Sequence, residues 1–254
     1  MPTIAFVSPK GGVGKSTSAL LLATALAKVS KVTMIDADPN FPIGDWAASG
    51  NGPPNLTVVA NNEDDNTIVT EKNIVERIEE AASKTPIVIV DLEGTASKTV
   101  LYAIAEADLV IIPTRGSPLD AKQAARTVQV VRDNQKAAGT KKDHAVLLTC
   151  TSPTIRSRNL THIQKGLIEA GVPVLESELN ERDAFRAIFA FDVTLDQLNP
   201  KQVPNLENAK LNVMEFAEEV VARLMAQKRA NAGELDEAEE EGTDEADDVG
   251  ESAA

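Results

Sequence analysis

The sequence has 254 residues, 43% of them hydrophobic, which is enough to bury the core of one large α/β domain. Its single cysteine, Cys150, excludes a disulfide framework or a four-cysteine metal site, favours the cytoplasm, and is expected to be a small core residue. No apolar run approaches the roughly 18 residues of a membrane-spanning helix, so we expect a soluble protein without a signal peptide.

The net charge of −14 is unevenly distributed along the chain. Residues 231–254 contain eleven acidic residues and no basic ones, which leaves a net charge of only −3 for residues 1–230. A segment so rich in carboxylates and without aromatic residues cannot bury enough apolar surface to fold. The sequence therefore predicts a folded domain over residues 1–230, followed by an acidic disordered tail over residues 231–254.

The chain opens with a buried strand, a glycine-rich loop and a helix. The strand is predicted over Thr3–Val7 and the helix over Ser18–Val29, and the loop between them reads SPKGGVGKST over residues 8–17. Because glycine carries no Cβ, the backbone N–H groups of such a loop can surround phosphate oxygens at the N-terminus of a helix. This order of elements is typical of a P-loop.

Within a P-loop, the last lysine reaches the β- and γ-phosphates and the next hydroxyl binds Mg²⁺, which assigns these tasks to Lys15 and Ser16. The predicted nucleotide-binding residues are Gly11, Gly12, Val13, Gly14, Lys15, Ser16 and Thr17. Pro9 stands where an ordinary P-loop has glycine, and a second lysine, Lys10, follows it. The loop gives Lys10 no evident role within its own subunit.

Further buried strands alternate with helices along the rest of the chain. These strands are predicted over Val32–Ile35, Leu56–Val59, Ile87–Val90, Leu109–Ile112, Ala145–Thr149 and Val172–Leu175. Apolar residues recur with helical spacing at Ile74, Ile78 and Ala82, and again at Val213, Ala217, Val220 and Leu224. The pattern predicts an α/β P-loop NTPase fold, a mostly parallel twisted sheet with helices on both faces.

Acidic residues follow two of these strands directly. Asp36 and Asp38 come at the end of the second strand, and Asp91 ends the run IVIVD. Ligands of open α/β sheets bind outside the carboxyl ends of the strands, and an acid in an apolar run is costly unless it is used. We therefore expect Asp91 to hold Mg²⁺ through water, although a lone strand-end aspartate can also cap the next helix.

The loop resembles the deviant Walker A motif, K-G-G-x-G-K-[ST], of the ParA/MinD class of dimerising ATPases. The resemblance extends over roughly residues 2–225. It includes DADP at residues 36–39, Asp45-Trp46, and ADLVIIPTRGSPLD at residues 107–120, which are similar to the small, ParF-like ParA proteins of plasmid partition.

This resemblance implies an ATPase that uses ATP and Mg²⁺, turns over slowly and forms an ATP-sandwich homodimer. It implies that Lys10 crosses to the nucleotide of the partner subunit and acts with Lys15, and that Asp38 positions or activates the attacking water. Asp36 and Asp91 would lie around Mg²⁺ with Ser16. Residues 113–120 would lie near the dimer and the nucleotide, and they are equally typical of a strand followed by a helix capped at Ser117.

The sequence carries a weaker signal for base specificity and for DNA binding. The guanine-binding motif Asn-Lys-x-Asp is absent, which favours ATP, and we expect the base near Thr149–Thr151 and Leu179–Asp183. Binding of non-specific DNA is a family expectation, and Arg156 and Arg158 are candidate contacts. Such binding would depend strongly on salt, because counterions are released from the DNA phosphates.

The functional prediction is a partition ATPase that segregates plasmid or chromosomal DNA over the nucleoid in the cytoplasm. A ParB-like centromere-binding or adaptor protein would be its partner, and membrane binding is disfavoured because the last helix runs into the acidic tail. Two alternatives remain. One is a positioning factor for a non-DNA protein cluster or for a secretion or conjugation machine. The other is an ATP-dependent metabolic ligase of the same fold, which the short loops disfavour.

Overall fold

The computed structural model describes residues 1–60, 69–94, 97–139, 142–154 and 158–247, and their side chains as far as residue 230. Arg156 lies outside the described residues. The elements in chain order are β1 (Thr3–Phe6), α1 (Lys15–Leu26), β2 (Val32–Ala37), α2 (Pro42–Ala48), β3 (Leu56–Val59), α3 (Ile74–Lys84), β4 (Ile87–Leu92), α4 (Lys98–Glu106), β5 (Leu109–Arg115), α5 (Pro118–Ala138), β6 (Asp143–Thr151), α6 (Arg158–Glu169), β7 (Val174–Asn180), α7 (Asp183–Ala190) and α8 (Leu206–Asp247).

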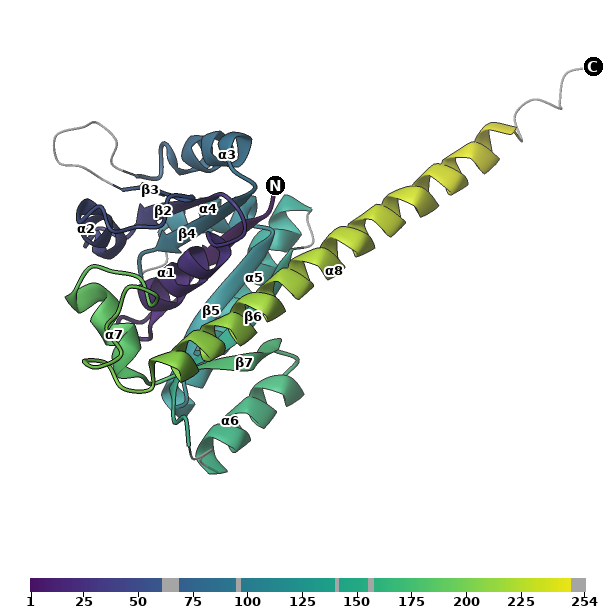
Figure 1. Cartoon of the computed structure of the whole chain (residues 1–254). Helices are drawn as coiled ribbons and strands as arrows, with labels where there is room; N and C mark the ends of the chain where they lie inside the picture. Colours follow the sequence, from purple (N-terminus) through teal and green to yellow (C-terminus); the bar gives the residue numbers. More distant parts are fainter. Residues whose placement is uncertain (61–68, 95–96, 140–141, 155–157, 248–254) are drawn as a thin grey trace, which may run out of the picture. The chain divides into compact units, whose positions relative to one another are not determined.

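The strands form one parallel sheet in the order β3-β2-β4-β1-β5-β6-β7, which confirms the predicted fold class (Figure 1). Each predicted strand is present, but β7 begins later than expected. Val172 donates its N–H to the Leu167 carbonyl at the end of α6, and Pro173 has no N–H to donate. The strand therefore starts at Val174 and extends to Asn180.

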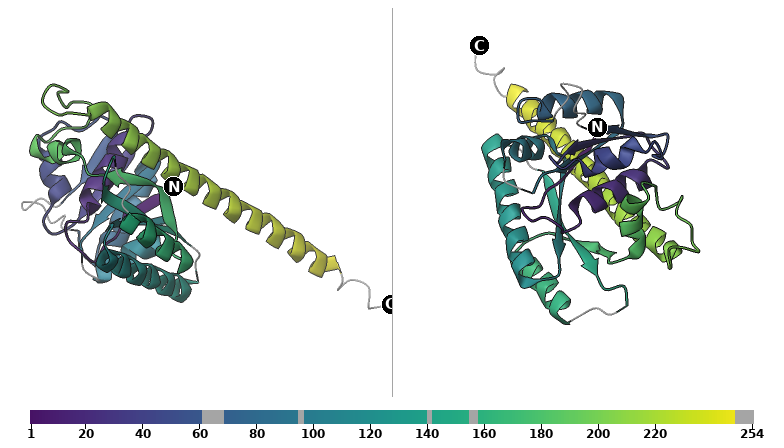
Figure 2. Two further views of the ribbon diagram at one scale, coloured as in Figure 1. Left: turned by 90° about the horizontal axis from the view of Figure 1, so that it is seen from below. Right: turned by 90° about the vertical axis from the view of Figure 1, so that its left-hand side faces the viewer.

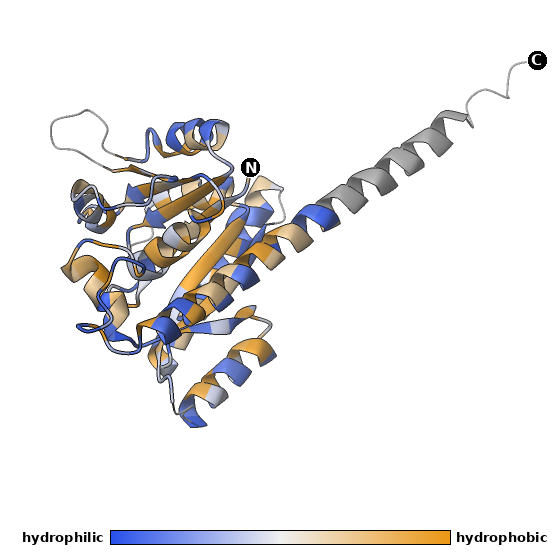
Figure 3. Ribbon diagram, viewed as in Figure 1, coloured by the Kyte–Doolittle hydropathy of each residue, from blue (hydrophilic) through white to orange (hydrophobic). Residues whose placement is uncertain are grey.

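Helices cover both faces of this sheet. Helices α3, α4, α5 and α6 contact one another in sequence along one face, whereas α1 packs against the central strands. The right-hand view of Figure 2 shows α5 and α1 on opposite sides of the sheet. Because both faces are covered, β1, β2 and β5 are buried over nearly their whole length, and the sheet forms a hydrophobic band in Figure 3.

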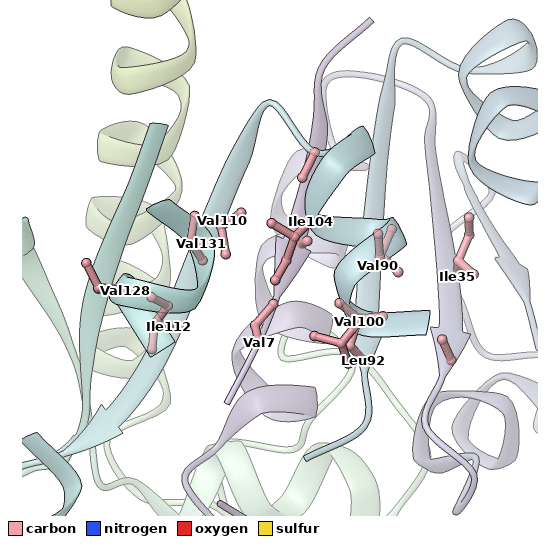
Figure 4. Packing of buried hydrophobic residues seen from close by; sticks show 14 of the residues in the cluster. Val7, Ile35, Val90, Leu92, Val100, Ile104, Val110, Ile112, Val128 and Val131 are labelled. Carbon is pink, nitrogen blue, oxygen red and sulfur yellow. The ribbon is translucent and has the colours of Figure 1, made fainter. Parts of the chain in front are cut away.

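The core between the sheet and helices α3 to α6 is a single cluster of aliphatic side chains (Figure 4). Val90 of β4 and Val110 of β5 point toward this layer, where Ile104 of α4 and Val131 of α5 lie fully buried. Tight packing of this kind fixes the heights of neighbouring strands relative to one another. The carboxyl ends of β1, β2, β4 and β5 thus meet at one edge.

Helix α8 runs across the domain boundary that the sequence predicts at residue 230, and this boundary stays a prediction. The chain divides into two compact units, Met1–Glu219 and Val220–Ala254, so the division falls inside the helix and before residue 230. The helix also includes residues 231–247, for which the sequence predicts disorder. Nine of the 17 residues of this stretch are alanine or glutamate, which are strong helix formers, so local preference favours a helix there. No helix in the described part of the chain is long and apolar enough to cross a membrane.

The first part of α8 satisfies backbone groups along β7, the last strand of the sheet. Glu219 accepts hydrogen bonds from the backbone N–H groups of Glu176 and Ser177, at 2.8 Å each, and from the Ser177 hydroxyl at 2.6 Å. Asn212 accepts from the Asn180 N–H at 3.0 Å. An edge strand otherwise presents unpaired backbone groups to other chains, so α8 protects this edge.

Replacing Glu219 with alanine should therefore lower the free energy of unfolding by about 1–3 kcal/mol, because the N–H donors on β7 lose their acceptor. Urea denaturation measures the effect. Glu218→Ala is the matched control, since Glu218 is the exposed neighbour on the same helix and its loss should change stability by less than about 0.5 kcal/mol. Equal stabilities of the two variants would show that Glu219 does not support the edge.

Candidate functional site

The glycine-rich loop joins β1 to α1 in a conformation that requires glycine. Gly12 and Gly14 have φ values of 73° and 86°, in the left-handed region that side chains disfavour. Gly14 precedes the first residue of α1, which is Lys15 and not the predicted Ser18. The N–H groups of a first helical turn have no acceptor within the helix, so this end of α1 is suited to bind an anion.

In the described part of the chain, residues of this loop line two neighbouring pockets. The phosphate pocket, about 350 Å³, is lined by Lys10, Gly11, Gly12, Gly14, Lys15, Ser16, Thr17, Asp38, Asn40, Pro42 and Gly94. The second pocket, about 240 Å³, is lined by Gly12, Gly14, Thr17, Arg115, Thr149, Cys150, Leu179, Asn180, Glu181, Arg182, Phe185 and Arg186. Because they share P-loop residues, one elongated ligand can occupy both. The segments predicted to meet the base do come together in the second pocket.

Two residues of β6, Thr149 and Cys150, lie in the site in ways that the sequence does not predict. The buried Thr149 donates its hydroxyl hydrogen to the Val13 carbonyl at 2.7 Å, so it anchors the glycine-rich loop to β6. The prediction that Cys150 is a core residue was wrong. Its side chain is exposed and lines the second pocket, because its φ of 53° interrupts the alternation of the strand.

Lys15 lies between two of the predicted carboxylates. Its Nζ is 2.9 Å from Asp91 Oδ1 and 3.2 Å from Asp38 Oδ2, and the lysine side chain is only 8% exposed. Burial raises the pKa of Asp91, and the charge of Lys15 acts in the opposite direction. Burial favours a higher pKa for Asp38 as well. Hydrogen bonds from Asn40 and the charge of Lys15 outweigh this effect, so the pKa of Asp38 is lowered. An anion bound by Lys15 would compete with both carboxylates.

The residues around Asp91 fit a magnesium ion. Asp91 Oδ2 is buried and has no hydrogen-bond partner among the described residues, which leaves an acceptor for a metal-bound water. Over the same part of the chain, no group of three or more His, Cys, Asp or Glu side chains is placed to hold a metal by itself. Magnesium commonly takes one or two protein ligands and completes its shell with water and nucleotide phosphates, which suits this arrangement.

Asp36 has a structural role that the sequence does not indicate. Its Oδ2 accepts the N–H groups of Ile43 and Gly44 at 2.9 Å each, at the start of α2, and its Oδ1 accepts the Asp38 N–H at 3.1 Å. Asp36 is fully buried and is the register partner of Asp91 across β2 and β4. Burial raises its pKa to about 6, with backbone hydrogen bonds opposing and the charge of Asp91 reinforcing the shift. A magnesium role for Asp36 stays a prediction.

The structure corrects the interpretation that Lys10 has no intramolecular role. The Lys10 ammonium group forms an ion pair with Asp120, and the other Asp120 oxygen accepts the Ser117 hydroxyl at 2.7 Å. Ser117 also caps α5 by accepting the Asp120 N–H at 3.1 Å, as predicted. The motif S-x-x-D at residues 117–120 carries the signal for the cap. Nothing in the sequence indicated that the same aspartate reaches Lys10.

Comparison with known protein families gives a match to the VirC1 protein family over residues 1–227. The chain belongs to the VirC1 protein family. The resemblance to ParA/MinD-type ATPases is thereby confirmed as a family relationship, because a curated relative, Protein ParA from Rhizobium radiobacter, is 42% identical over 225 residues. That alignment covers 88% of this chain and 98% of the relative.

More distant relatives share the fold of this VirC1-family protein. The maintenance of carboxysome distribution protein A from Gloeobacter kilaueensis is 28% identical over 85% of this chain and 93% of its own. The septum site-determining protein MinD from Pyrococcus horikoshii, solved in complex with Mg-ADP, superposes with a TM-score of 0.66 at 18% identity, covering 86% of this chain and 95% of MinD. At that identity, the structural likeness establishes the fold alone.

The Asp36 arrangement predicts how stability depends on pH in this VirC1-family protein. Asp36→Ala should lower the free energy of unfolding at pH 8 by about 1–3 kcal/mol, because its backbone donors lose their acceptor. With its pKa raised to about 6, Asp36 in the folded state retains a proton that the unfolded chain releases. The stability that Asp36 contributes should therefore rise as the pH falls from 8 toward 4, and the difference from the variant should widen.

Thermal denaturation of both proteins across this range measures the trend. Asp45→Ala is the control, because Asp45 is an exposed acid in the first turn of the same helix. Its removal should change the free energy of unfolding by about 0.3–1 kcal/mol. A difference between wild type and Asp36→Ala that narrows at low pH would contradict the assigned pKa direction.

Proposed function

We propose that this VirC1-family protein is an ATPase that binds ATP with Mg²⁺, dimerises around the nucleotide, and uses this cycle to distribute DNA over the nucleoid. The observation that carries the proposal is the contrast between the lysines of the loop. Lys15 is 8% exposed and faces carboxylates of its own subunit, whereas Lys10 is 46% exposed at the rim of the phosphate pocket. A lysine at the rim can reach a second molecule.

The residues of the phosphate pocket provide the groups that phosphoryl transfer needs. Lys15 and the N–H groups at the start of α1 would bind the phosphates, and Ser16 and Asp91 would hold Mg²⁺, which supplies charge neutralisation when bound. Once a phosphate takes Lys15, Asp38 is released to orient water. Asn40 holds the other Asp38 oxygen through its N–H at 3.0 Å and its side-chain amide at 2.9 Å. Lys10 from the partner would add a positive charge as negative charge develops.

The cargo is proposed from the relatives. The name of the Rhizobium radiobacter relative, ParA, supports DNA partition with a ParB-like centromere-binding or adaptor protein that stimulates hydrolysis. The carboxysome distribution relative favours a second candidate, in which the same switch positions a protein cluster. In both cases the dimer would bind non-specific DNA as its track. Arg158, exposed at the start of α6 and shortly after the carboxyl end of β6, is a proposed contact together with Arg156.

The first prediction separates the lysines. In an Asp38→Ala background, where hydrolysis should stall, ATP should produce a dimer in light scattering. Adding Lys15→Ala should weaken ATP binding by about 100-fold or more, because a charge-assisted phosphate contact is lost. Adding Lys10→Ala should leave ATP binding to the monomer within about threefold and abolish the dimer, because its contact would form only between subunits.

Lys31→Ala is the control for a loss of charge, since Lys31 is exposed at the amino end of β2, on the side of the sheet away from the pocket. Lys31→Ala should change neither the affinity for ATP nor the dimerisation. Equal loss of ATP affinity in the Lys10 and Lys15 variants would assign both lysines to the same subunit's phosphates. A monomeric Asp38→Ala protein in excess ATP would refute the sandwich dimer.

The second prediction concerns DNA. Arg156→Glu with Arg158→Glu should weaken ATP-dependent binding to DNA of arbitrary sequence by about tenfold at low salt, because each removed phosphate contact also removes counterion release. Basal ATP hydrolysis should not change. Fluorescence anisotropy across a salt series measures the affinity for DNA. Lys31→Glu is the control, because Lys31 lies at the amino end of β2, away from the carboxyl ends of the strands. Unchanged DNA affinity in the double variant would exclude this site.

A further inference from the structure

Arg115 is a cation that the proposed mechanism does not yet use. It is the last residue of β5, its side chain is exposed, and it lines the second pocket beside Gly12 and Thr17. Its guanidinium group makes no hydrogen bond or ion pair with the residues that the structure describes. A cation at the edge of a phosphate site without a partner of its own is available to change contacts.

The chain after β5 holds Arg115 close to Asp120. The Ser117 N–H donates to the Arg115 carbonyl at 2.8 Å, which closes a tight turn, and Ser117 then binds Asp120 through its hydroxyl. Gly116 lies against α6 in this turn, since a Cβ there would be 2.5 Å from Leu160 Cδ1. The turn is therefore confined, and it places the cation of Arg115 within electrostatic reach of Asp120.

A nearby cation stabilises the ionised form of Asp120. It is 5% exposed, and its present cation is Lys10. Burial alone would raise the pKa of Asp120, but hydrogen bonds from Lys10 and Ser117 and the charges of Lys10 and Arg115 lower it. If Lys10 moves to a partner subunit, Asp120 loses its ion pair while remaining largely buried. A buried carboxylate without a cation opposes that movement.

We infer that Arg115 replaces Lys10 as the ion-pair partner of Asp120 when Lys10 reaches the nucleotide of the partner subunit. The inference rests on the proposed dimer. Asp120 then alternates between two cations, Lys10 in the monomer and Arg115 in the dimer, and stays paired in both states. The planar guanidinium group can donate two parallel hydrogen bonds to a carboxylate, so it is a suitable replacement. Arg115 is in this sense a positioning residue, since it acts on Lys10 through Asp120.

A double-mutant cycle in the Asp38→Ala background tests the exchange. Arg115→Gln should weaken ATP-dependent dimerisation by about tenfold in sedimentation equilibrium, which is a typical coupling for a contacting charge pair. Each variant is compared with the parent at saturating ATP, so that a contact between Arg115 and the nucleotide does not enter the comparison. Arg115→Lys, which keeps the charge, should stay within about threefold of the parent in dimerisation. In proteins that also carry Asp120→Asn, Arg115→Gln should have no further effect, because a neutral side chain needs no replacement cation.

Lys122→Gln is the matched control, because it removes an exposed positive charge from α5, only two residues beyond Asp120 in sequence. It should leave dimerisation unchanged. A tenfold loss that persists with Asp120→Asn would show that Arg115 acts independently of Asp120 and would overturn the inference. Undisturbed dimerisation of Arg115→Gln would overturn the inference and leave the proposed function intact. A parent protein that never dimerises with ATP would refute both the proposed function and the inference.

Discussion

The contact of Lys15 with Asp91 and Asp38 is the constraint on which the rest of the site depends. A lysine and carboxylates that are mostly buried must stay paired, because an uncompensated charge away from water is costly. Phosphates carry the same sign of charge as these carboxylates and need the same lysine. In the proposed function, nucleotide binding would therefore exchange anions around a fixed cation, and this exchange would free Asp38.

The same logic extends to the surface of the site. Lys10 is paired with Asp120 in the single chain, so it starts from a contact that must break before it can serve another subunit. Both lysines thus hold carboxylates where phosphates would later bind. The difference lies in burial, since Lys15 is enclosed by β2 and β4 and Lys10 remains at the rim. In the proposed dimer, this difference in burial would separate a lysine that serves its own subunit from one that serves a neighbour.

Much of this arrangement was predictable from local patterns. The glycine spacing predicts the loop, because only glycine adopts the φ values found at Gly12 and Gly14 without strain. The apolar runs predict the strands, because a parallel sheet is buried on both faces. The boundaries were less predictable. The start of β7 depends on Val172 donating to α6, and the start of α1 depends on the loop, so neither is encoded by hydrophobic periodicity alone.

By itself, the sequence determined the fold class, the P-loop and the presence of acids at the carboxyl ends of β2 and β4, because these follow from short-range patterns of residue type. Only the tertiary structure decided which charges meet. Lys10 and Asp120 are 110 residues apart in sequence, and Asp36 turned out to hold the start of α2 with its carboxylate. Such contacts depend on the strand order and on the height at which each strand ends. Those features are set by packing across the whole sheet, which no local pattern specifies.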